Sequence, residues 1–359
     1  MAKVKRPKNW DDKLNDFKQP KPYKPNKTQQ KFLDNLDHIV ISSSGGKDSA
    51  ILIRETLKRF PHMKDYMTIV HAVIDIDWHE TRGMVKKQAK HFGLPLVEVW
   101  GQYGKDKGEL IYGDDWTDDP DSFDQRKTIL YNLILPRRNM ETGKLGQQKW
   151  PEMGNSRWCT AEMKIIPINK WINNNFEEGS NILQVIGERF DESAKRFAMA
   201  KNNNLFRKND KTSKSLNVYD WSLIHHISLD EVWTILEKEQ IPTHKCYSWG
   251  VSRASCAICI YSDFNEILIA ADKAPDIVAQ MIYFERGIDH TFRRIKGENW
   301  TIEDILEFLT DHKIDAIARK ASKALEKVMV IVDSLEEQIG TAKKERQRLA
   351  RLAKSRSKK

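Results

Sequence analysis

The sequence predicts an α/β fold: a parallel sheet flanked by helices, followed by a helical part that carries cysteines and by a long C-terminal helix. Apolar runs at residues 38–41, 67–76, 94–99 and 182–186 have the length of buried strands. Segments with helical apolar spacing alternate with these runs, and this alternation is typical of a parallel sheet. The last helix is predicted because apolar residues recur at steps of three and four from 318 to 342.

Length and composition limit the classes of protein. The chain has 359 residues, of which 40% are hydrophobic and 31% charged. At roughly 100–200 residues per domain, it has room for two domains. Residues 1–10 lack the apolar middle of a signal peptide, and no stretch approaches the ~20 apolar residues of a membrane span. We therefore expect a cytoplasmic protein, in which four cysteines point to metal or redox chemistry rather than to disulfides.

The net charge of +9 is concentrated at the two ends of the chain. Residues 1–30 hold nine Lys or Arg against three Asp, and residues 341–359 hold nine against one Glu. Prolines and lysines keep a segment extended and solvated, which predicts a basic disordered arm over residues 1–28. The basic ends suit the phosphates of a nucleic acid or an acidic partner, or they serve solubility alone. The spacing at 318–342 fits either packing on the chain's own domain or pairing with a second copy.

A candidate phosphate loop follows the first apolar run. Residues 42–49 read SSSGGKDS and lead directly into a segment with helical spacing. Two glycines let the backbone turn tightly and present N–H groups to a phosphate, and the helix N-terminus behind them favours anions. Asp48 or Ser49 is expected to cap that helix. The alternative is a glycine turn without a ligand. The expected phosphate-binding residues are Ser42, Ser44, Gly45, Gly46, Lys47, Asp48 and Ser49.

Two aspartates lie at the end of the second predicted strand. Asp75 and Asp77 come where the apolar run 67–76 ends, close to the predicted loop. Ligands of parallel sheets lie at the carboxyl ends of the strands. We therefore expect these carboxylates to bind a ribose or adenine group, or to help hold Mg²⁺. In the alternative interpretation, Asp77 or Thr81 caps the next helix.

Basic residues flank a cysteine in the segment 157–164, which reads RWCTAEMK. A helix would place Thr160 and Lys164 on one face, with Arg157 a further turn back. Two cations beside Cys159 would favour the thiolate, which is the nucleophilic form of cysteine. The alternative is an inert buried cysteine.

A second basic turn follows the apolar run 182–186. Gly187 ends that run, and Arg189 and Glu192 come next. A planar guanidinium binds phosphate or sulfate through two parallel hydrogen bonds, so Arg189 is a candidate anion ligand that Glu192 would orient. The alternative is an ion pair at the surface.

The other three cysteines lie close together in the sequence. Cys256 and Cys259 form a C-x-x-C pair, and Cys246 lies ten residues earlier. Together with Cys159 they would suit an iron–sulfur cluster or a structural Zn²⁺, since both accept four thiolates. Otherwise Cys256 and Cys259 cycle as a redox pair, or the thiols are inert.

Taken together, the motifs resemble those of a known family. SGGKDS at 44–49, R-x-C-T-x-x-x-K at 157–164 and G-x-R-x-x-E-S-x-x-R at 187–196 occur in this order in phosphoadenosine phosphosulfate (PAPS) reductase-like proteins. That family belongs to the PP-loop (adenine nucleotide alpha hydrolase-like) superfamily, whose fold is Rossmann-like. It includes bacterial and phage members and is close to the sulfur-inserting subunit of DNA phosphorothioation systems. The resemblance covers about residues 39–263.

The resemblance implies an adenine nucleotide (PAPS or ATP), Mg²⁺ at its pyrophosphate, and a bacterial or phage-infected cell. It also implies a [4Fe-4S] cluster whose ligands would be Cys159, Cys246, Cys256 and Cys259. No cysteine follows Cys259, whereas PAPS reductases carry their nucleophile in a C-terminal E-C-G-I-H segment. We therefore expect sulfonucleotide reduction or sulfur transfer through a different cysteine. The catalytic candidates are Lys47, Cys159, Arg189 and Cys256. Beyond the loop, the nucleotide is expected to contact Asp75, Asp77, Arg157, Lys164, Gly187, Arg189 and Glu192.

Two other functions fit the same sequence. One is an ATP-dependent iron–sulfur sulfurtransferase that modifies DNA, and the other is a nucleotide-sensing module without turnover that docks through its C-terminal helix. Expected partners besides the nucleotide are a nucleic acid at the basic ends, a sulfur or electron donor protein and a second copy of the chain. The expected domains are the arm 1–28, a PAPS reductase-like PP-loop domain over 29–263, a helical extension over 264–314, and an amphipathic helix with a basic tail over 315–359.

Overall fold

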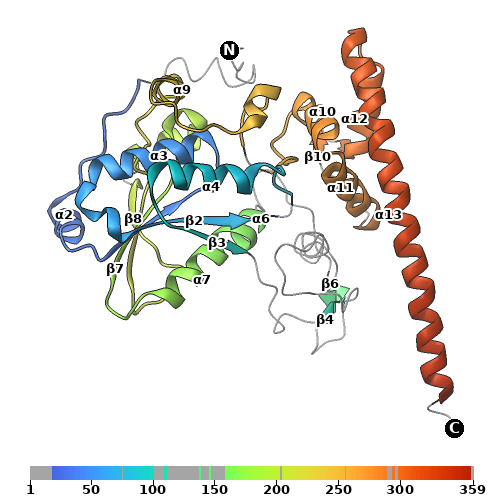
Figure 1. The fold of residues 1–359 in the computed structure, drawn as a ribbon, viewed down its shortest axis with the longest axis horizontal. Coiled ribbons are helices and arrows are strands. Elements are labelled where there is room, and N and C mark those ends of the chain that lie inside the picture. Colours follow the sequence, from blue (N-terminus) through green and yellow to red (C-terminus); the bar gives the residue numbers. More distant parts are fainter. Residues whose placement is uncertain are drawn as a thin grey trace. The chain divides into compact units, whose positions relative to one another are not determined.

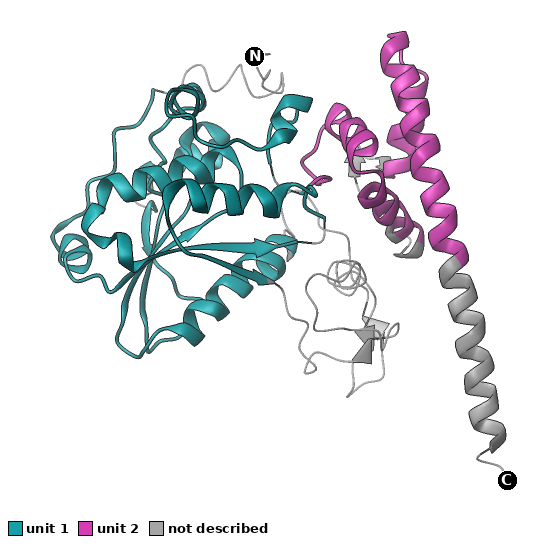
Figure 2. Ribbon diagram, viewed as in Figure 1, with its two compact units in different colours: residues 1–102, 158–256 teal, residues 103–157, 257–359 magenta. Residues whose placement is uncertain are grey.

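A computed structural model describes residues 18–74, 76–100, 158–202, 204–254, 256–288, 293–295 and 298–356, together with three two-residue strands between 109 and 146. The chain divides into two compact units (Figure 2). Unit 1 holds residues 1–102 and 158–256, and unit 2 holds residues 103–157 and 257–359. The domain boundaries expected after residues 28, 263 and 314 stay predictions.

Unit 1 is built on a six-stranded sheet. From one edge to the other, its strands are β3 (Leu96–Trp100), β2 (Met67–Val73), β1 (His38–Ser42), β7 (Asn181–Val185), β9 (Asn217–Trp221) and β8 (Phe206–Lys208). The first five run parallel, which confirms the predicted α/β class, whereas β8 pairs antiparallel with β9. Ile39 of β1 pairs with both Met67 and Leu183, so β1 is central and its carboxyl end lies between those of β2 and β7.

Helices cover both faces of the sheet (Figure 1). On one face lie α3 (Lys47–Arg59), α4 (Thr81–Phe92) and α9 (Leu229–Lys238), and on the other lies α7 (Ile166–Asn175). Ile39 and Ile41 belong to the first core and Val40 to the second, as the alternation of side chains along a strand requires. Because both faces are covered, the three central residues of this strand, Ile39 to Ile41, are all apolar and buried. The shorter elements of unit 1 are α2 (Lys27–Leu33), η1 (Pro61–Tyr66), α6 (Trp158–Thr160), η3 (Ala161–Ile165), η4 (Phe190–Glu192), α8 (Ala194–Lys201) and η5 (Lys245–Trp249).

The last part of the predicted arm is ordered on unit 1, which corrects the expectation for residues 19–28. The side-chain amide of Gln19 donates to the carbonyl of His226 at 2.9 Å. The ring of Tyr23 stacks on Phe206 with 6.4 Å between centroids. Burial of an aromatic ring offsets the conformational entropy that is lost when a few residues become ordered. The proline and lysine content of this segment does not predict that burial. Residues 1–17 lie outside the described part of the chain.

Helices α3 and α4 begin differently from the sequence-based expectation. Gly46 is the N-cap of α3, so Asp48 and Ser49 lie in its first turn and do not cap it. The hydroxyl of Ser49 instead accepts the N–H of Ser44, at 3.0 Å. Glu80 is the N-cap of α4 without a side-chain cap, so neither Asp77 nor Thr81 has that role. Ser49 of α3 can reach the loop because the turn between β1 and α3 is only four residues long.

Unit 2 is largely helical. Its elements after residue 256 are α10 (Phe264–Lys273), α11 (Pro275–Ile288), β10 (Arg293–Ile295), β11 (Glu298–Trp300), α12 (Ile302–Thr310) and α13 (Asp315–Arg356). The antiparallel strands β4 (Glu109–Leu110), β5 (Arg137–Arg138) and β6 (Leu145–Gly146) also belong to it. Ala321, Val328 and Val332 of α13 are fully buried, and α13 contacts α10, α11 and α12. Much of the apolar seam therefore packs on its own unit. No helix in the described part of the chain combines the length and the apolarity needed to cross a membrane.

We expect Asp220→Asn to stabilise the protein at neutral pH. Burial raises the pKa of Asp220 to about 6, although Arg207 and the side chain of Asn209 oppose this. The folded state holds the carboxyl proton of Asp220 more tightly than the unfolded chain does. The resulting contribution to the free energy of unfolding is complete below about pH 4 and is lost as pH rises through about 6. The variant should gain about 2 kcal/mol at pH 7 and nothing near pH 4, measured by urea unfolding. The exposed Asp210→Asn is the control; equal stability profiles for both variants would contradict the prediction.

Candidate phosphate-binding site

The loop between β1 and α3 requires glycine at Gly45. Its φ of +72° lies in the left-handed region. A Cβ atom there would lie 2.9 Å from Cγ2 of Val85 and 3.3 Å from the carbonyl oxygen of Thr81. The backbone of the loop thus passes directly against α4, which is the close approach that the Gly-Gly pair allows.

Hydroxyl groups hold the loop in shape. The N–H of Gly45 donates to Oγ of Ser43 at 3.2 Å, and the Oγ atoms of Ser44 and Ser49 lie 3.1 Å apart. Ser42 is fixed from the next strand, because the side-chain amide of Gln184 donates to its Oγ at 3.0 Å. The loop is therefore preorganised at the N-terminus of α3, where backbone N–H groups and the helix dipole favour an anion.

Lys47 is buried at the start of α3, with 4% of its surface exposed. Its Nζ donates to the carbonyl oxygen of Ser252 at 3.1 Å and lies 3.3 Å from Oδ2 of Asp48. Burial by itself raises the pKa of Asp48, but the charges of Lys47 and Arg189 outweigh it and hold the pKa below its usual value. The Asp48 carboxylate thus links two cations beside the loop.

Arg189 lies where the sequence places it but has different partners. Its Nε is 2.7 Å from Oδ1 of Asp48, and its Nη1 is 2.9 Å from Oδ1 of Asp191. The expected partner Glu192 acts on Arg189 through its charge, and its carboxylate also lies 3.6 Å from Nε of Arg196. Arg189 therefore ties the turn after β7 to the phosphate loop. A Cβ on the neighbouring Gly187 would be 3.5 Å from the carbonyl oxygen of Asp48, so that glycine lies beside the loop as well.

The segment that carries Cys246 and Cys256 lies against the same loop. The hydroxyl of Tyr247 accepts the N–H of Lys47 at 2.9 Å and that of Ala254 at 3.3 Å. The same hydroxyl would lie 3.2 Å from a Cβ on Gly46. Tyr247 therefore covers the N–H of Lys47, the first residue of α3. Nothing in the spacing of the motifs predicts this contact, which spans 200 residues. Tyr247 is the main residue of the site that the sequence does not identify.

Cys256 lies beside the carboxyl end of β2. Its backbone forms an antiparallel bridge with Asp77, and its thiol hydrogen-bonds to the Asp77 side chain. Burial raises the pKa of Asp77, whereas the charges of Lys164 and His71 and the bond from Cys256 lower it. Oδ1 of Asp77 is buried with no hydrogen-bond partner among the described residues. Ring Nδ1 of His71 donates to the carbonyl oxygen of Ser43 at 2.9 Å, which connects this group to the loop.

The segment after Trp158 departs from the predicted helical phase. Residues Ala161–Ile165 form a π-helical turn, so Thr160 and Lys164 are not related by the i, i+4 geometry of an α-helix. Lys164 instead acts electrostatically on Asp77 and His71. Arg157 and Asp75 lie outside the described residues, and their expected roles remain predictions.

Comparison with known proteins decides the family. The model of the phosphoadenosine phosphosulfate reductase domain matches residues 38–262, which span the whole site described above. The chain belongs to this family. Its mostly parallel sheet with helices on both faces is the α/β arrangement that the sequence predicts.

Individual relatives are distant. An uncharacterized protein of Methanocaldococcus jannaschii is 25% identical over 230 residues, which cover 64% of this chain and 37% of that protein. This PAPS reductase family member thus spans little more than a third of that relative's length. Among solved structures, the PAPS reductase of Candida auris in its phosphate complex is 9% identical, covering 64% of this chain and 95% of its own, with a TM-score of 0.37. The U34-tRNA thiolase NcsA of Methanococcus maripaludis with its [4Fe-4S] cluster is 14% identical, covering 81% and 86%, with a TM-score of 0.35.

The four cysteines of this family member are divided between the two units. Cys246 is fully buried in η5, and Cys159 and Cys256 are partly exposed in unit 1, whereas Cys259 belongs to unit 2. Within the described part of the chain, no three His, Cys, Asp or Glu side chains are placed to hold a metal ion. The four-cysteine ligand set of a [4Fe-4S] cluster remains a prediction.

Tyr247→Phe should destabilise the protein and open the loop. The variant removes the acceptor of two N–H groups, those of Lys47 and Ala254, while keeping the ring contact with Trp233 at 5.1 Å. Leaving buried donors unpaired costs about 1–3 kcal/mol. Inorganic pyrophosphate should restore part of this loss, because its oxygens replace the phenol at the N-terminus of α3. Thermal unfolding with and without pyrophosphate measures both effects; unchanged stability without ligand would show that the Tyr247 bonds contribute nothing.

Proposed function

We propose that this protein is a PP-loop enzyme that binds an adenine nucleotide at residues 42–49 and carries out sulfur chemistry on it, as sulfonucleotide reduction or sulfur transfer. The observation that carries the proposal is the contact between Lys47 and the cysteine segment, through Tyr247, Ser252 and Ala254. The segment that carries Cys246 and Cys256 thereby contacts the loop that is suited to phosphate. Membership of the PAPS reductase family supports the same reading.

The residues of the site have separable roles in this proposal. The N–H groups of the loop and of the first turn of α3 bind the phosphate oxygens and stabilise charge that develops on them. Lys47 and Arg189 keep the surroundings of the phosphate positive, with Asp48 between them. Asp77, with its unpaired buried oxygen, would bind the ribose or hold Mg²⁺, whose role is to neutralise the pyrophosphate.

Cys256 is the thiol that we assign to the reaction. It is the cysteine held at the carboxyl end of β2 by its bridge to Asp77, where ligands of parallel sheets bind. Its side chain is partly exposed, as a reacting thiol requires, whereas Cys246 is fully buried. Cys159 remains a second candidate, because it lies in α6, which leads directly into the π-helical turn that carries Lys164.

Titration calorimetry with ATP and with PAPS tests the nucleotide part of the proposal. Lys47→Ala should weaken binding of the preferred nucleotide about 10-fold or more, since a charge-assisted contact contributes about 1.5–3 kcal/mol. Lys58→Ala is the matched control, because it removes the same charge from the exposed other end of α3. Equal affinities for the two variants, or no binding of either nucleotide by the wild type, would refute the proposal.

Anaerobic purification with iron, sulfide and zinc analysis tests the cofactor. Stoichiometric iron and sulfide would show that the cysteines gather around a cluster in the assembled protein. Zinc would indicate a structural site. Protein without either metal would leave Cys256 and Cys159 as the reactive thiols.

A second proposed function is ATP-dependent sulfur transfer to DNA. The observation that favours it is the charge of the chain ends, where residues 341–359 hold nine Lys or Arg against one Glu. If these residues bind phosphates, deleting them should lower the salt dependence of DNA binding, measured by fluorescence anisotropy between low and high salt. An unchanged salt dependence would remove this argument and leave the small-molecule reaction.

A further inference from the structure

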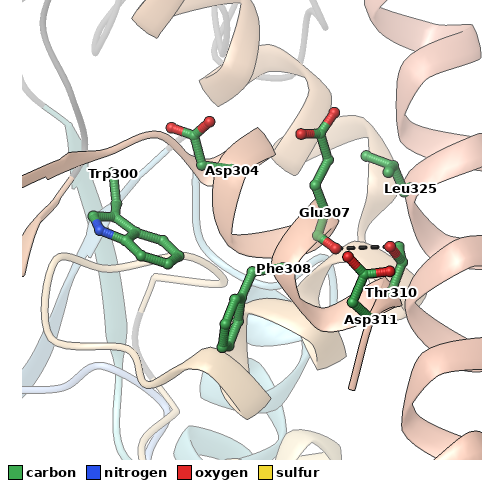
Figure 3. Close-up of a pocket in the computed structure, with 7 residues that line it drawn as sticks. All are labelled: Trp300, Asp304, Glu307, Phe308, Thr310, Asp311 and Leu325. Carbon is green, nitrogen blue, oxygen red and sulfur yellow. Dashed lines mark hydrogen bonds between the residues drawn. The ribbon is translucent and has the colours of Figure 1, made fainter. Parts of the chain in front are cut away.

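Unit 2 carries a groove that the nucleotide site does not use. It has a volume of about 770 Å³ and lies between α12 and the first part of α13, beside the end of β11 (Figure 3). Aromatic and acidic side chains share its walls. The lining residues on which the argument rests are Trp300, Asp304, Glu307, Phe308, Asp311 and Leu325.

The aromatic wall of the groove is exposed. Phe308 leaves 52% of its surface in solvent, although it touches Trp300 edge-to-face with 5.5 Å between ring centroids. The ring of Phe264 of α10 contacts both, tilted at 5.8 Å between centroids from Trp300 and edge-to-face at 5.9 Å from Phe308. Contiguous exposed apolar surface with polar residues at its rim marks an interaction site, and here Trp300 and Phe308 share one groove with three carboxylates. The faces of such rings also attract cations.

The acidic wall of the groove comes from one helix and the residue after it. Residues 301–311 contain four carboxylates and no Lys or Arg. Glu303 is neutralised by Arg286 of α11 at 2.9 Å, and Asp304 uses one oxygen to cap α12, accepting the N–H of Thr301 at 2.8 Å. Glu307 and Asp311 remain as exposed carboxylates among the residues that line the groove (Figure 3). The groove is therefore suited to a cationic segment that also has apolar side chains.

The chain itself contains such a segment. Residues 343–356 read KKERQRLARLAKSR, with basic residues interleaved with two leucines. They cannot reach the groove of their own molecule, because α13 is continuous from Asp315 to Arg356. Along that helix, Lys343 lies 18 residues beyond the groove residue Leu325, which is about 27 Å at 1.5 Å per residue. The distance between the groove and the basic segment is the same in every copy. The basic segment of each of two copies can therefore lie in the groove of the other copy.

We propose that the acidic groove of unit 2 binds the basic C-terminal segment of a second copy of this chain. Two α13 helices then lie antiparallel, and the two-fold symmetry of the pair fills both grooves with the same contacts. The charges attract the basic segment, and the leucines at 349 and 352 offer apolar side chains to Phe308 and Leu325. This surface is independent of the nucleotide loop, so the dimer forms with or without the proposed enzyme activity.

Sedimentation and light scattering of the full-length protein test the dimer. The wild type should show twice the chain mass of 41.9 kDa at low salt and dissociate as salt rises, since the contact is mainly between charges. The double variant Glu307→Lys with Asp311→Lys should be monomeric. Glu177→Lys with Glu178→Lys, which makes the same charge change at exposed positions of unit 1, should remain dimeric.

A charge swap makes the test specific. Adding Arg348→Glu and Arg351→Glu to the groove variant should restore the doubled mass, because both partners have then exchanged signs. Deleting residues 341–359 should give a monomer whatever the state of the groove. A wild type that is monomeric at every salt concentration, or a dimer that survives groove reversal, would overturn the proposal. So would a basic segment whose deletion changes nucleic-acid binding but not the mass.

Discussion

Replacing Gly45 with alanine should destabilise the protein by about 2–3 kcal/mol and abolish nucleotide binding. A left-handed backbone costs a non-glycine residue about 1–2 kcal/mol. The new Cβ would in addition lie 2.9 Å from Cγ2 of Val85, and valine has few rotamers with which to move away. Relief of the clash has to move the loop away from α4, so the loop N–H groups that we propose to bind phosphate lose their alignment. Chemical unfolding and nucleotide titration measure the two effects.

The matched control for this change is Gly83→Ala. Gly83 lies within α4, and a Cβ there meets nothing within 4 Å. Alanine in a helix is about 0.5–1 kcal/mol more favourable than glycine, so this variant should be more stable than the wild type and bind nucleotide equally well. If the two variants were equally stable, the positive φ and the close approach of the loop would not constrain Gly45.

The second large effect is expected from Cys256→Ser. Serine retains a donor for Asp77, so the bridge between residues 77 and 256 should persist and nucleotide affinity should stay within about two-fold. A hydroxyl cannot replace a thiol as sulfur nucleophile, sulfur carrier or metal ligand. Turnover should therefore fall by roughly 10³-fold or more, as the loss of a nucleophile does in other enzymes.

Ser248→Ala is the control for Cys256→Ser. Ser248 is exposed in the same segment, and its hydroxyl donates to the backbone carbonyl oxygen of Lys245 at 2.8 Å. Its replacement should leave both turnover and affinity unchanged. Full activity of the Cys256→Ser protein would move the chemistry to Cys159. Loss of nucleotide binding together with turnover would assign Cys256 a structural role.

Some features of the site follow from short stretches of sequence. The run 38–49 contains the apolar strand, the two glycines and the helix start in one piece, so β1, the loop and α3 are all encoded by neighbours. The alternation of apolar runs and amphipathic segments likewise predicts that the strands of the sheet run parallel, as five of the six do. These predictions succeed because strand period, helix period and glycine conformation act within a few residues.

Other features depend on how single polar groups are shared. The sequence predicts Asp48 or Ser49 as a helix cap, and this prediction is wrong, because Gly46 is the N-cap of α3. Ser49 bonds the loop, and Asp48 lies between Lys47 and Arg189. A polar side chain has several partners within reach, and the nearest in sequence is preferred only when no stronger charge comes close in space. The sequence also predicts that Lys164 and Thr160 share one face of an α-helix. The π-helical turn at 161–165 changes the spacing of side chains, so this prediction does not hold.

Local spacing and motifs read in order were enough to predict the α/β class, the family and the position of the candidate phosphate loop. The groups that surround this loop were not predictable in the same way and depend on the tertiary fold. It placed the hydroxyl of Tyr247 on the N–H of Lys47 and Cys256 beside Asp77, across chain separations that no periodicity encodes. It also placed the exposed rings of unit 2 beside the carboxylates of α12. The physical reason is that packing of the core fixes such distant pairs, and many sequences with the same local pattern would pair differently.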